Sequence, residues 1–312
     1  MICLGIDTSN YTSSAALYNS ETGELLHKRR LLTVKKGEVG LRQSDAVFQH
    51  VKSMPEILEE LFSGFSKAPD IISASVSPRD ADGSYMPCFM CGKGIAQSLA
   101  AAYKKELFFF SHQAGHIAAA LLSANRLDLI NREFIAFHVS GGTTEAVLVE
   151  PCKEKIFSVR LIASSLDLKA GQAIDRVGAA LGLPFPAGAS LDSLSLQSSR
   201  EFSAKPFMRG GSCSLSGLEN ICGKMLEKGE EKADIAKFCI DYISAALSSM
   251  TDSALEKYSG VPLVYSGGVM SNSIIRKRFF EKYAAVFAKP EFSSDNAAGI
   301  ALLGALCGSR EE

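Results

Sequence analysis

Excess charge, long apolar runs and histidine are all scarce in this sequence. The 33 basic and 34 acidic residues leave a net charge of −1 at pH 7, so no global basic field attracts nucleic acid. Contact with RNA would have to come from local basic patches such as 27–30 or 276–278, for which a solvated surface is the plain alternative. No apolar run reaches the ~18–20 residues of a membrane helix, and the N-terminus lacks the basic segment of a secretory signal. We therefore expect a cytoplasmic protein that does not enter a membrane.

Paired cysteine motifs and the common nucleotide-binding loops are also missing. The eight cysteines are scattered, and Cys88 and Cys91 form a lone CxxC without the second pair that a structural zinc site needs. Because no secretory signal is present, the thiols are expected to be free in a reducing compartment. Neither GxxxxGK[ST] nor GxGxxG occurs, which disfavours P-loop and dinucleotide-binding proteins.

One arrangement of strands occurs twice along the chain. Residues 2–33 read as strand, polar turn, strand and strand, and residues 133–164 repeat that order. Helical segments follow each copy. This repetition predicts a duplicated α/β fold with lobes at 1–112 and 113–294, and a closing helix at 295–309 that could return to the first lobe.

Three turns of small residues follow strands in this arrangement. They read "GIDTSNYTSS", "VSGGTTEA" and "VYSGGVMSNS", and the last two contain Gly-Gly. Glycine lets a backbone approach a phosphate closely because no Cβ intervenes, and exposed N–H groups supply the matching dipole. Each turn alone is more often only a tight corner. Three of them in a duplicated frame favour a nucleotide-binding site.

Two of the five histidines, His112 and His116, are four residues apart and follow Ser111, which is placed to cap a helix. Residues at i and i+4 lie on one helical face, where two imidazoles can share a metal ion. The alternative is a pair of histidines that are hydrogen-bonded near a helix start. A metal would need a third ligand, and Asp295 opens the closing helix, where it could equally be an N-cap. A metalloprotease is disfavoured because no glutamate follows the first histidine.

The strand and corner arrangement resembles the superfamily of actin, sugar kinases and heat-shock chaperones. Its members have an actin-like ATPase fold, related to ribonuclease H, with two duplicated lobes around a nucleotide cleft. The resemblance implies a first phosphate corner at Asp7 and Ser9 and a second at 140–143. It also implies a nucleoside contact at Gly267, Gly268 and Asn272.

A narrower resemblance covers nearly the whole chain. The segments "HQAGH", "HVSGGTTEAVLV", "GQAIDRVGAALGLPFPAG", "CSLSGLEN", "SGGVMSN" and "PEFSSDNAAGIA" occur in one order and resemble the tRNA threonylcarbamoyladenosine transferases. This resemblance implies one divalent metal ion, iron or zinc, on His112, His116 and Asp295. It further implies contacts with threonylcarbamoyl-AMP, or with ATP or ADP, from His138, Val139, Ser140, Gly141, Gly142, Thr143, Asp175, Gly188, Asp192 and Asn272.

The implied enzyme is an acyltransferase of tRNA processing. The N6 amine of adenosine 37 attacks the carbamoyl carbon of threonylcarbamoyl-AMP and AMP leaves, while a metal polarises the acyl group. The implied partners are tRNA, a smaller actin-like homologue and an ATPase of the same pathway. Singly, Asp175 would also suit a helix surface, Asp192 a helix start and Asn272 a helix cap.

The first half departs from the family pattern at several positions. The segment 41–50 keeps only His50 of an expected "PELASRxH", and "SPRDADGSYMPCF" replaces a glycine-rich loop. Gln172 and Thr143 stand where the family has glutamate and histidine. These departures leave open a divergent paralogue, either a carbamoyltransferase on another acceptor or a nucleotide-binding, non-catalytic assembly partner.

Overall fold

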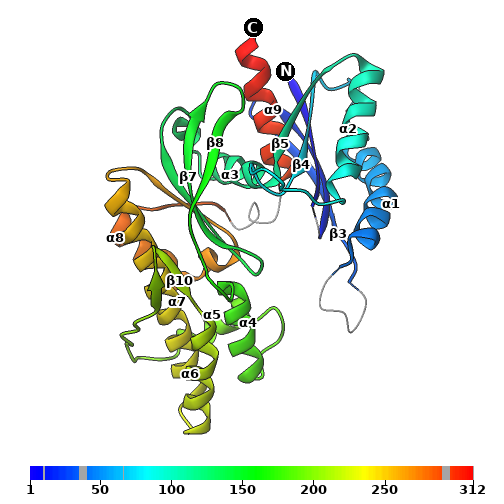
Figure 1. Cartoon of the computed structure of the whole chain (residues 1–312). Helices are drawn as coiled ribbons and strands as arrows, with labels where there is room; N and C mark the ends of the chain where they lie inside the picture. The colour runs from blue at the N-terminus through cyan, green and yellow to red at the C-terminus, as the bar shows by residue number, and fades with distance from the viewer. Residues whose placement is uncertain (10, 35–40, 66, 290–295, 312) are drawn as a thin grey trace. The chain divides into compact units, whose positions relative to one another are not determined.

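The computed structural model describes residues 1–9, 11–34, 41–65, 67–289 and 296–311. These residues form two compact units, which are described separately (Figure 1). The first unit contains Met1–Ile130, the hairpin tip Pro151–Val159 and the C-terminal helix. The second contains Asn131–Glu150 and the chain from Arg160 through the last strand.

The sheet of the first unit joins three antiparallel strands to two parallel ones. Its order is β3-β2-β1-β4-β5, in which β1 pairs antiparallel with β2 and parallel with β4. Strands β1 and β2 are buried along nearly their whole length because their sequences carry apolar or small residues at almost every position. The bounds are β1 Ile2–Ser9, β2 Thr12–Asn19, β3 Leu25–Leu31, β4 Ile71–Ser77 and β5 Glu106–Ser111.

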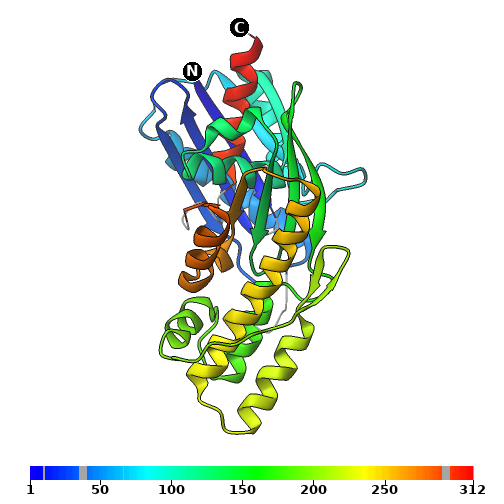
Figure 2. The ribbon, with the colours of Figure 1, turned by 90° about the vertical axis from the view of Figure 1, so that its left-hand side faces the viewer.

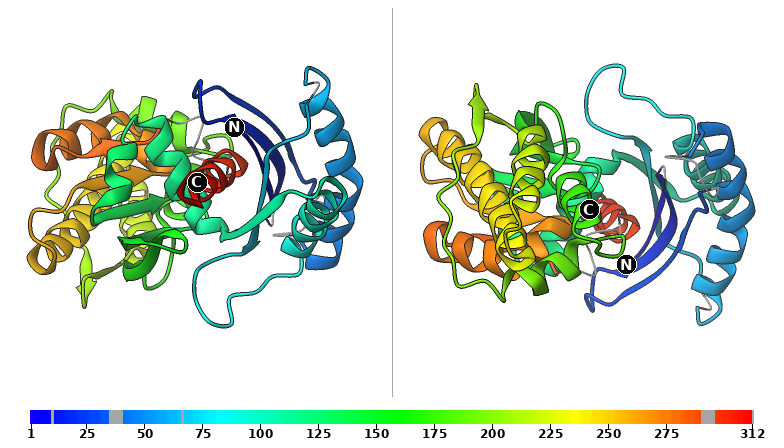
Figure 3. Two further views of the ribbon diagram at one scale, coloured as in Figure 1. Left: turned by 90° about the horizontal axis from the view of Figure 1, so that it is seen from above. Right: turned by 90° about the horizontal axis from the view of Figure 1, so that it is seen from below.

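Helices cover both faces of this sheet. Helices α1 (Gln43–Phe62) and α2 (Phe89–Tyr103) pack on one face, and α9 (Ala297–Glu311) packs on the other against β1, β2 and β4. Figure 3 shows the sheet lying between them. Helix α3 (His112–Ser123) follows β5 directly and packs along α9, and a short 3₁₀ helix, η1 (Leu127–Asn131), comes next.

The last helix approaches the first strand very closely. A Cβ atom on Gly5 of β1 would lie 2.3 Å from the carbonyl oxygen of Ala297, so only glycine fits there. Ser73 of β4 donates a hydrogen bond from Oγ to the carbonyl oxygen of Ile300 over 2.9 Å. The first compact unit therefore includes both α9 and α3. The lobes predicted at 1–112 and 113–294 have other boundaries than these compact units, because the first unit also contains residues 113–130. The predicted lobes describe the two copies of the repeated strand order, and their boundaries stay a prediction.

The sheet of the second unit has the order β12-β11-β6-β7-β8. Strand β6 pairs antiparallel with β7 and parallel with β11, and β11 pairs parallel with β12. A separate two-stranded sheet is formed by β9 and β10. The bounds are β6 Phe134–Val139, β7 Thr144–Cys152, β8 Ile156–Ser164, β9 Phe207–Arg209, β10 Ser212–Ser214, β11 Leu263–Ser266 and β12 Val286–Phe287.

A long buried helix, α7 (Lys232–Lys257), organises the helices of the second unit. It packs against α4, α5, α6 and α8, and Figure 2 shows α6 lying beside it. Its isoleucines, alanines and leucines join the core of the sheet through Ile240 and Ala246. The other helices are α4 Ala170–Ala180, α5 Gly188–Ser195, α6 Ser216–Glu227, the 3₁₀ helix η2 Gly268–Ser271 and α8 Ser273–Tyr283.

The two sheets share one strand order. In each, three consecutive strands come first, and two later parallel strands join at the edge of the first strand, which gives β3-β2-β1-β4-β5 and β8-β7-β6-β11-β12. This repeated order confirms the duplicated α/β fold that the sequence predicts. Within the ranges that the structure describes, no helix is long and apolar enough to cross a membrane.

Candidate functional site

The first corner (residues 7–9) ends β1 in the first unit. Asp7 is 1% exposed, accepts a hydrogen bond from Ser75 Oγ, and has Oδ1 3.0 Å from His112 Nδ1. Burial alone would raise the pKa of Asp7, but the His112 ring and the donors around the carboxylate hold that pKa below its ordinary value. Ser9 lies at the strand end and is half-buried. The Asp7 carboxylate therefore faces an imidazole inside the protein.

The two histidines begin α3 on one helical face. Ser111 Oγ accepts a hydrogen bond from the Ala114 N–H over 3.1 Å, which is the helix cap that the sequence predicts. The rings of His112 and His116 have centroids 4.7 Å apart, and both side chains are half-buried. The spacing of four residues thus brings the two rings together, as a shared ligand would require.

Asn296 lies beside His112 immediately before α9. Its Nδ2 atom is 2.9 Å from His112 Nδ1 and 3.1 Å from His112 Nε2. The residue is 3% exposed, and its Oδ1 atom is buried without a hydrogen-bond partner among the described residues. Because this oxygen is buried without a partner, a hydrogen-bond donor or a cation placed next to it would be stabilised.

The cluster contains two of the three metal ligands that the sequence predicts, His112 and His116. The predicted third ligand, Asp295, lies outside the described residues, and within those residues no group of three His, Cys, Asp or Glu could hold a metal. The described residues supply two adjacent imidazoles and a carboxylate that contacts one of them, which is part of a metal-ligand set and not a complete one. A metal-binding histidine commonly has such a carboxylate partner on its second nitrogen, the place that Asp7 takes at His112.

Two glycines allow α3 and α9 to approach each other closely next to this cluster. A Cβ on Gly299 would lie 1.9 Å from the carbonyl oxygen of Gly115, and a Cβ on Gly115 would lie 3.1 Å from the carbonyl oxygen of Asn296. This contact carries Asn296 to His112 across 184 residues of sequence. No local sequence pattern around either glycine predicts this contact between the two helices.

His50, the remnant of the expected "PELASRxH" segment, is fully buried on α1. Its Nδ1 atom is 2.7 Å from Ser13 Oγ, which is itself 2.7 Å from Ser53 Oγ. Burial lowers the pKa of His50, and its Nε2 atom has no hydrogen-bond partner among the described residues. His50 thus links α1 to β2 through its contact with Ser13.

The second corner (residues 140–143) joins β6 to β7 in the second unit. The Ser140 N–H donates to the Thr143 carbonyl over 2.7 Å, and the Thr143 N–H donates to Ser140 Oγ over 3.2 Å. Gly141 and Gly142 are exposed, with no atom near the place where a Cβ would be. The corner is a closed turn with an accessible backbone, as expected of a phosphate-binding loop.

The start of α4 packs on this corner. The Gly171 N–H donates to the Ser140 carbonyl over 3.1 Å, and a Cβ on Gly171 would lie 2.6 Å from Gly141 N. The first turn of a helix carries a partial positive charge. The corner therefore has a helix N-terminus as its direct neighbour.

The remaining predicted residues lie at strand ends and helix starts of the second unit. Gly267 has φ +96°, and a Cβ there would lie 2.2 Å from the Val139 carbonyl oxygen, so the end of β11 touches the end of β6. Asn272 caps α8 and donates from Nδ2 to Asp192 Oδ1 over 2.8 Å. Asp175 instead accepts the Ala187 N–H over 2.8 Å, just before Gly188 opens α5. Gly268 begins η2.

Several polar residues that sequence reasoning missed lie beside the strand ends of the second sheet or at the start of α6. Ser266 contacts His138, Glu145 is buried at 5% exposure opposite His138, and Asp167 accepts hydrogen bonds from the start of α6 at Ser216 and Leu215. Glu145 could have been identified from the sequence, because a glutamate within an otherwise apolar strand is unusual. The partners of Ser266 and Asp167 come from strand register and loop packing, which local patterns do not reveal.

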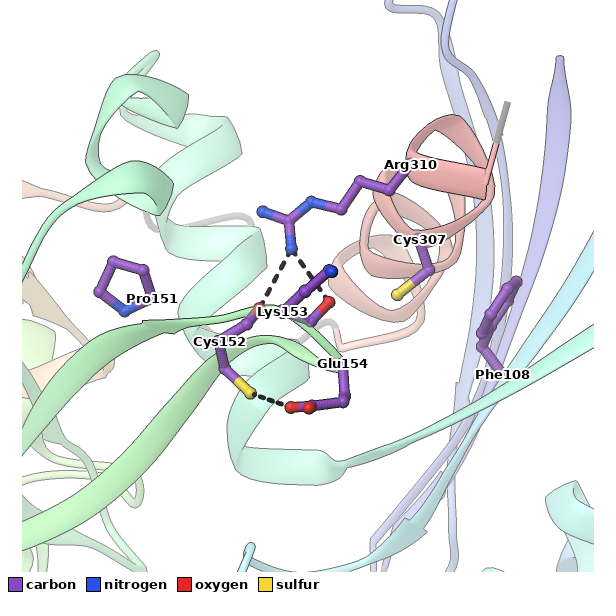
Figure 4. A pocket seen from close by; sticks show the side chains of 7 residues that line it. All are labelled: Phe108, Pro151, Cys152, Lys153, Glu154, Cys307 and Arg310. Carbon is purple, nitrogen blue, oxygen red and sulfur yellow. Dashed lines mark hydrogen bonds between the residues drawn. The ribbon is translucent and has the colours of Figure 1, made fainter.

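A separate hollow of about 800 Å³ lies in the first unit (Figure 4). Arg310 donates from Nη1 to the carbonyl oxygens of Cys152 and Lys153, and Cys152 Sγ is 3.2 Å from Glu154 Oε2. None of the predicted site residues lines it. The lining residues are Phe108, Pro151, Cys152, Lys153, Glu154, Cys307 and Arg310.

Known relatives and structures resemble this chain over most of its length. A tRNA N6-adenosine threonylcarbamoyltransferase of Buchnera aphidicola is 29% identical over 98% of this chain and 92% of its own. A probable bifunctional tRNA threonylcarbamoyladenosine biosynthesis protein of Methanocaldococcus jannaschii is 25% identical over 98% of this chain, which spans only 55% of that relative. Full-length HypF, solved in a phosphate- and nucleotide-bound form, matches 99% of this chain and 55% of its own with TM-score 0.61 and 14% identity. That structural likeness establishes the fold, which is the actin-like one.

The family model described as tRNA N6-adenosine threonylcarbamoyltransferase matches residues 34–302. The match runs from the first unit through the whole second unit and into α9. The family is one of transferase enzymes and of tRNA threonylcarbamoyladenosine biosynthesis. This chain belongs to the tRNA N6-adenosine threonylcarbamoyltransferase family.

Proposed function

We propose that this protein transfers the threonylcarbamoyl group of threonylcarbamoyl-AMP to N6 of adenosine 37 in tRNA, with iron or zinc bound by His112, His116 and Asp295. The observation that carries the proposal is the pair of adjacent imidazoles on α3, one of them held by a buried carboxylate. A carboxylate on one ring nitrogen orients the imidazole so that its other nitrogen can bind a metal ion, whereas nucleotide binding alone does not require such a pair.

The reaction requires one bond to form and one to break. The N6 nitrogen bonds to the carbamoyl carbon, the bond from that carbon to the phosphate oxygen breaks, and AMP leaves while N6 gives up a proton. A bound divalent metal would supply Lewis acidity toward the acyl oxygen. Asp7 would hold His112 in one orientation through Nδ1, so that the other ring nitrogen is the one presented to the ion.

The second unit would bind the nucleotide part of the donor. The open backbone of Gly141 and Gly142, next to the start of α4, suits the phosphate. The linked side chains of Asp192 and Asn272 suit the nucleoside, because together they retain free acceptor and donor capacity. His138, Val139, Gly267 and Gly268 of the second unit belong to the same proposed binding set, and so does Ser9 of the first unit.

The proposed partners are tRNA and other proteins of the threonylcarbamoyladenosine pathway, in the cytoplasm. The bifunctional name of the Methanocaldococcus jannaschii relative supports this, since a second activity of the pathway is joined to the matching part of that protein. The basic segment Arg276–Arg278 of α8 would be available for tRNA phosphates only in part, because Arg278 is already bound to Asp241.

The decisive experiment reconstitutes the transfer in vitro. Purified protein loaded with Fe²⁺ or Zn²⁺ is given threonylcarbamoyl-AMP and unmodified tRNA, and threonylcarbamoyladenosine is measured by mass spectrometry of the nucleosides. We expect transfer by the unaltered protein, loss of it in His112→Ala, and metal content falling in the same variant. Binding of the adenylate without transfer to any tRNA, even with pathway proteins added, would favour another acceptor. Binding of neither metal nor adenylate would favour an assembly partner.

A further inference from the structure

A small hollow of about 230 Å³ in the second unit is lined by the edge strand β8 and the C-terminal end of α7. Arg160 of β8 lines one side, and Ser253, Lys257 and the helix-capping Tyr258 line the other. Positions 253 and 257 are four residues apart and therefore lie on one face of the helix. Gly211, in the turn between β9 and β10, also lines the hollow, and a Cβ there would lie 3.7 Å from Ser253 Cβ. The hollow thus brings together three segments that are distant in the sequence.

The charged side chains that line this hollow are both cationic. Among the described residues, its lining includes Arg160 and Lys257 and no aspartate or glutamate. The acid that faces Arg160 is Glu150 of β7, outside the lining, with Oε2 3.6 Å from Arg160 Nη2. The C-terminus of α7 adds only about half a negative charge, so the local balance stays positive even when Glu150 is counted. The hollow therefore favours an anion.

Hydrogen-bond donors are available at the same place. Arg160 Nη1 donates to Tyr258 Oη over 3.1 Å, which uses one of the five guanidinium N–H groups and leaves the hydrogen of the tyrosine hydroxyl for another acceptor. Lys257 Nζ and Ser253 Oγ make no hydrogen bond to other described residues. A ligand that is negatively charged and accepts several hydrogen bonds would satisfy all four side chains.

The size of the hollow restricts the ligand to a small group. Pockets that enclose a whole small molecule have volumes of roughly 300–1,000 Å³, and this one is smaller. One water occupies about 30 Å³, so a phosphate group of five heavy atoms fits with a few waters, whereas a complete nucleotide does not. The Arg160 side chain is 55% exposed and Lys257 is exposed, so the cations are accessible from solvent. A phosphate that belongs to a large polymer can therefore reach them.

We propose that this hollow binds a backbone phosphate of tRNA. The inference rests on the proposed function, which supplies the identity of the polyanion. The planar guanidinium of Arg160 suits two phosphate oxygens, Lys257 adds a second charge, and the hydroxyls of Ser253 and Tyr258 donate hydrogen bonds. A backbone phosphate carries no sequence information, so the site positions the tRNA and does not select adenosine 37. Arg160 and Tyr258 are 98 residues apart, so no basic run in the sequence indicates this site.

Binding of unmodified tRNA, measured by fluorescence anisotropy at several salt concentrations, tests the site. Lys257→Gln and Arg160→Gln should each raise the Kd for tRNA about three- to tenfold. The double variant should also lower the slope of log Kd against log salt concentration by about one, because one phosphate contact is lost. Lys228→Gln is the matched control, since Lys228 is an exposed lysine at the C-cap of α6, and it should change neither quantity. The Kd for threonylcarbamoyl-AMP should stay within about twofold in every variant.

Thermal unfolding of every variant shows whether a loss of binding reflects a loss of structure. Arg160→Gln removes a contact with Tyr258, whereas Lys257→Gln loses no hydrogen bond to a described residue and should unfold at the temperature of the unaltered protein. Folded variants that keep the Kd for tRNA and the salt slope overturn the inference, and so does an unaltered protein that does not bind tRNA. Inorganic phosphate that binds at these residues, detected by NMR, without any change of tRNA affinity in the variants would show a site for small anions only and would also overturn it.

The same measurements separate this inference from the proposed function. If the unaltered protein binds tRNA through Arg160 and Lys257 but transfers no threonylcarbamoyl group, the proposed function fails and the binding site stands. If transfer takes place and the variants bind tRNA as tightly as the unaltered protein, this inference alone fails.

Discussion

The two units have the same strand order but opposite kinds of corner. In the first unit, the end of β1 carries a buried carboxylate, Asp7, that faces His112. In the second, the end of β6 carries two exposed glycines and an accessible backbone. The two units therefore share the strand order, whereas their corner residues differ: one corner holds a buried carboxylate and the other is an exposed glycine turn.

The units also stabilise their buried charges differently. Asp7 in the first unit is surrounded by hydroxyls and one imidazole, whereas Asp241 in the second lies between two cations. Lys237 Nζ is 2.8 Å and Arg278 Nη1 is 2.7 Å from the Asp241 carboxylate, and the Phe202 N–H donates to it as well. The ion-pair network fixes helices α7 and α8 to each other, because Asp241 and Lys237 are on α7 and Arg278 is on α8.

The largest effect is expected from breaking the ion-pair network. Asp241→Ala should lower the free energy of unfolding by about 3–5 kcal/mol, because the Lys237 side chain is only 7% exposed and loses its buried partner. Urea titration followed by circular dichroism measures the change. The exposed pair of Lys282 and Asp252 is the control, and Asp252→Ala should cost under about 1 kcal/mol. Equal effects of the two substitutions would show that the buried network does not hold the second unit together.

A smaller loss is expected where α9 closes the first unit. Gly299→Ala should cost about 1–3 kcal/mol, because the added methyl would meet the carbonyl oxygen of Gly115 and force α3 and α9 apart. Differential scanning calorimetry gives the change in unfolding temperature. Gly94→Ala in the exposed part of α2 is the matched control and should stabilise by about 0.5–1 kcal/mol. A neutral Gly299→Ala would mean that the two helices have room to separate.

Removing the charge of the first corner should weaken metal binding. Asp7→Asn keeps the shape of the side chain but no longer fixes the His112 ring by a charged acceptor, so affinity for Zn²⁺ should fall roughly 10–100-fold. Competition against a chromophoric chelator measures the affinity, and Asp82→Asn in an exposed loop serves as the control. Unchanged affinity in Asp7→Asn would separate the buried carboxylate from the proposed metal site.

The smallest effect concerns pH and Asp167, which binds the start of α6 through Ser214, Leu215 and Ser216. Burial alone would raise its pKa, but these hydrogen bonds hold the pKa of Asp167 well below its ordinary value. Stability from such a group is complete above the unfolded pKa, about 3.9, and is lost as pH falls below it. Asp167→Asn should therefore cost about 1 kcal/mol at pH 7, and the difference should shrink below about pH 4. A difference that does not depend on pH in urea titrations would contradict this.

The sequence was sufficient for the features that depend on local pattern. Alternating apolar strands with small-residue turns predicted the duplicated fold, which the two sheets and the family match confirm. Ser111 as a helix cap and the two histidine rings side by side follow from spacing along one helix. The roles proposed for these side chains in metal and nucleotide binding stay predictions.

The features that the sequence did not predict depend on contacts between distant segments. Asn296 reaches His112 only because Gly115 and Gly299 allow two helices to touch, and Ser266 reaches His138 only through the register of β11 on β6. Asp175 accepts the Ala187 N–H through one carboxylate oxygen, a contact that its local sequence does not predict, and its role in donor binding stays a prediction. A one-residue change of register or helix rotation would alter each of these contacts without changing any local pattern.

The crossing of α3 and α9 has a consequence for how the protein is made. Because the chain is synthesised from its N-terminus to its C-terminus, His112 leaves the ribosome well before Asn296, which follows 184 residues later. The entire second unit can finish folding while the first sheet still lacks the helix that covers one of its faces. A nascent or prematurely terminated chain thus exposes β1 and β4 on that side, and it would be recognised by chaperones or proteases before it could ever bind a substrate.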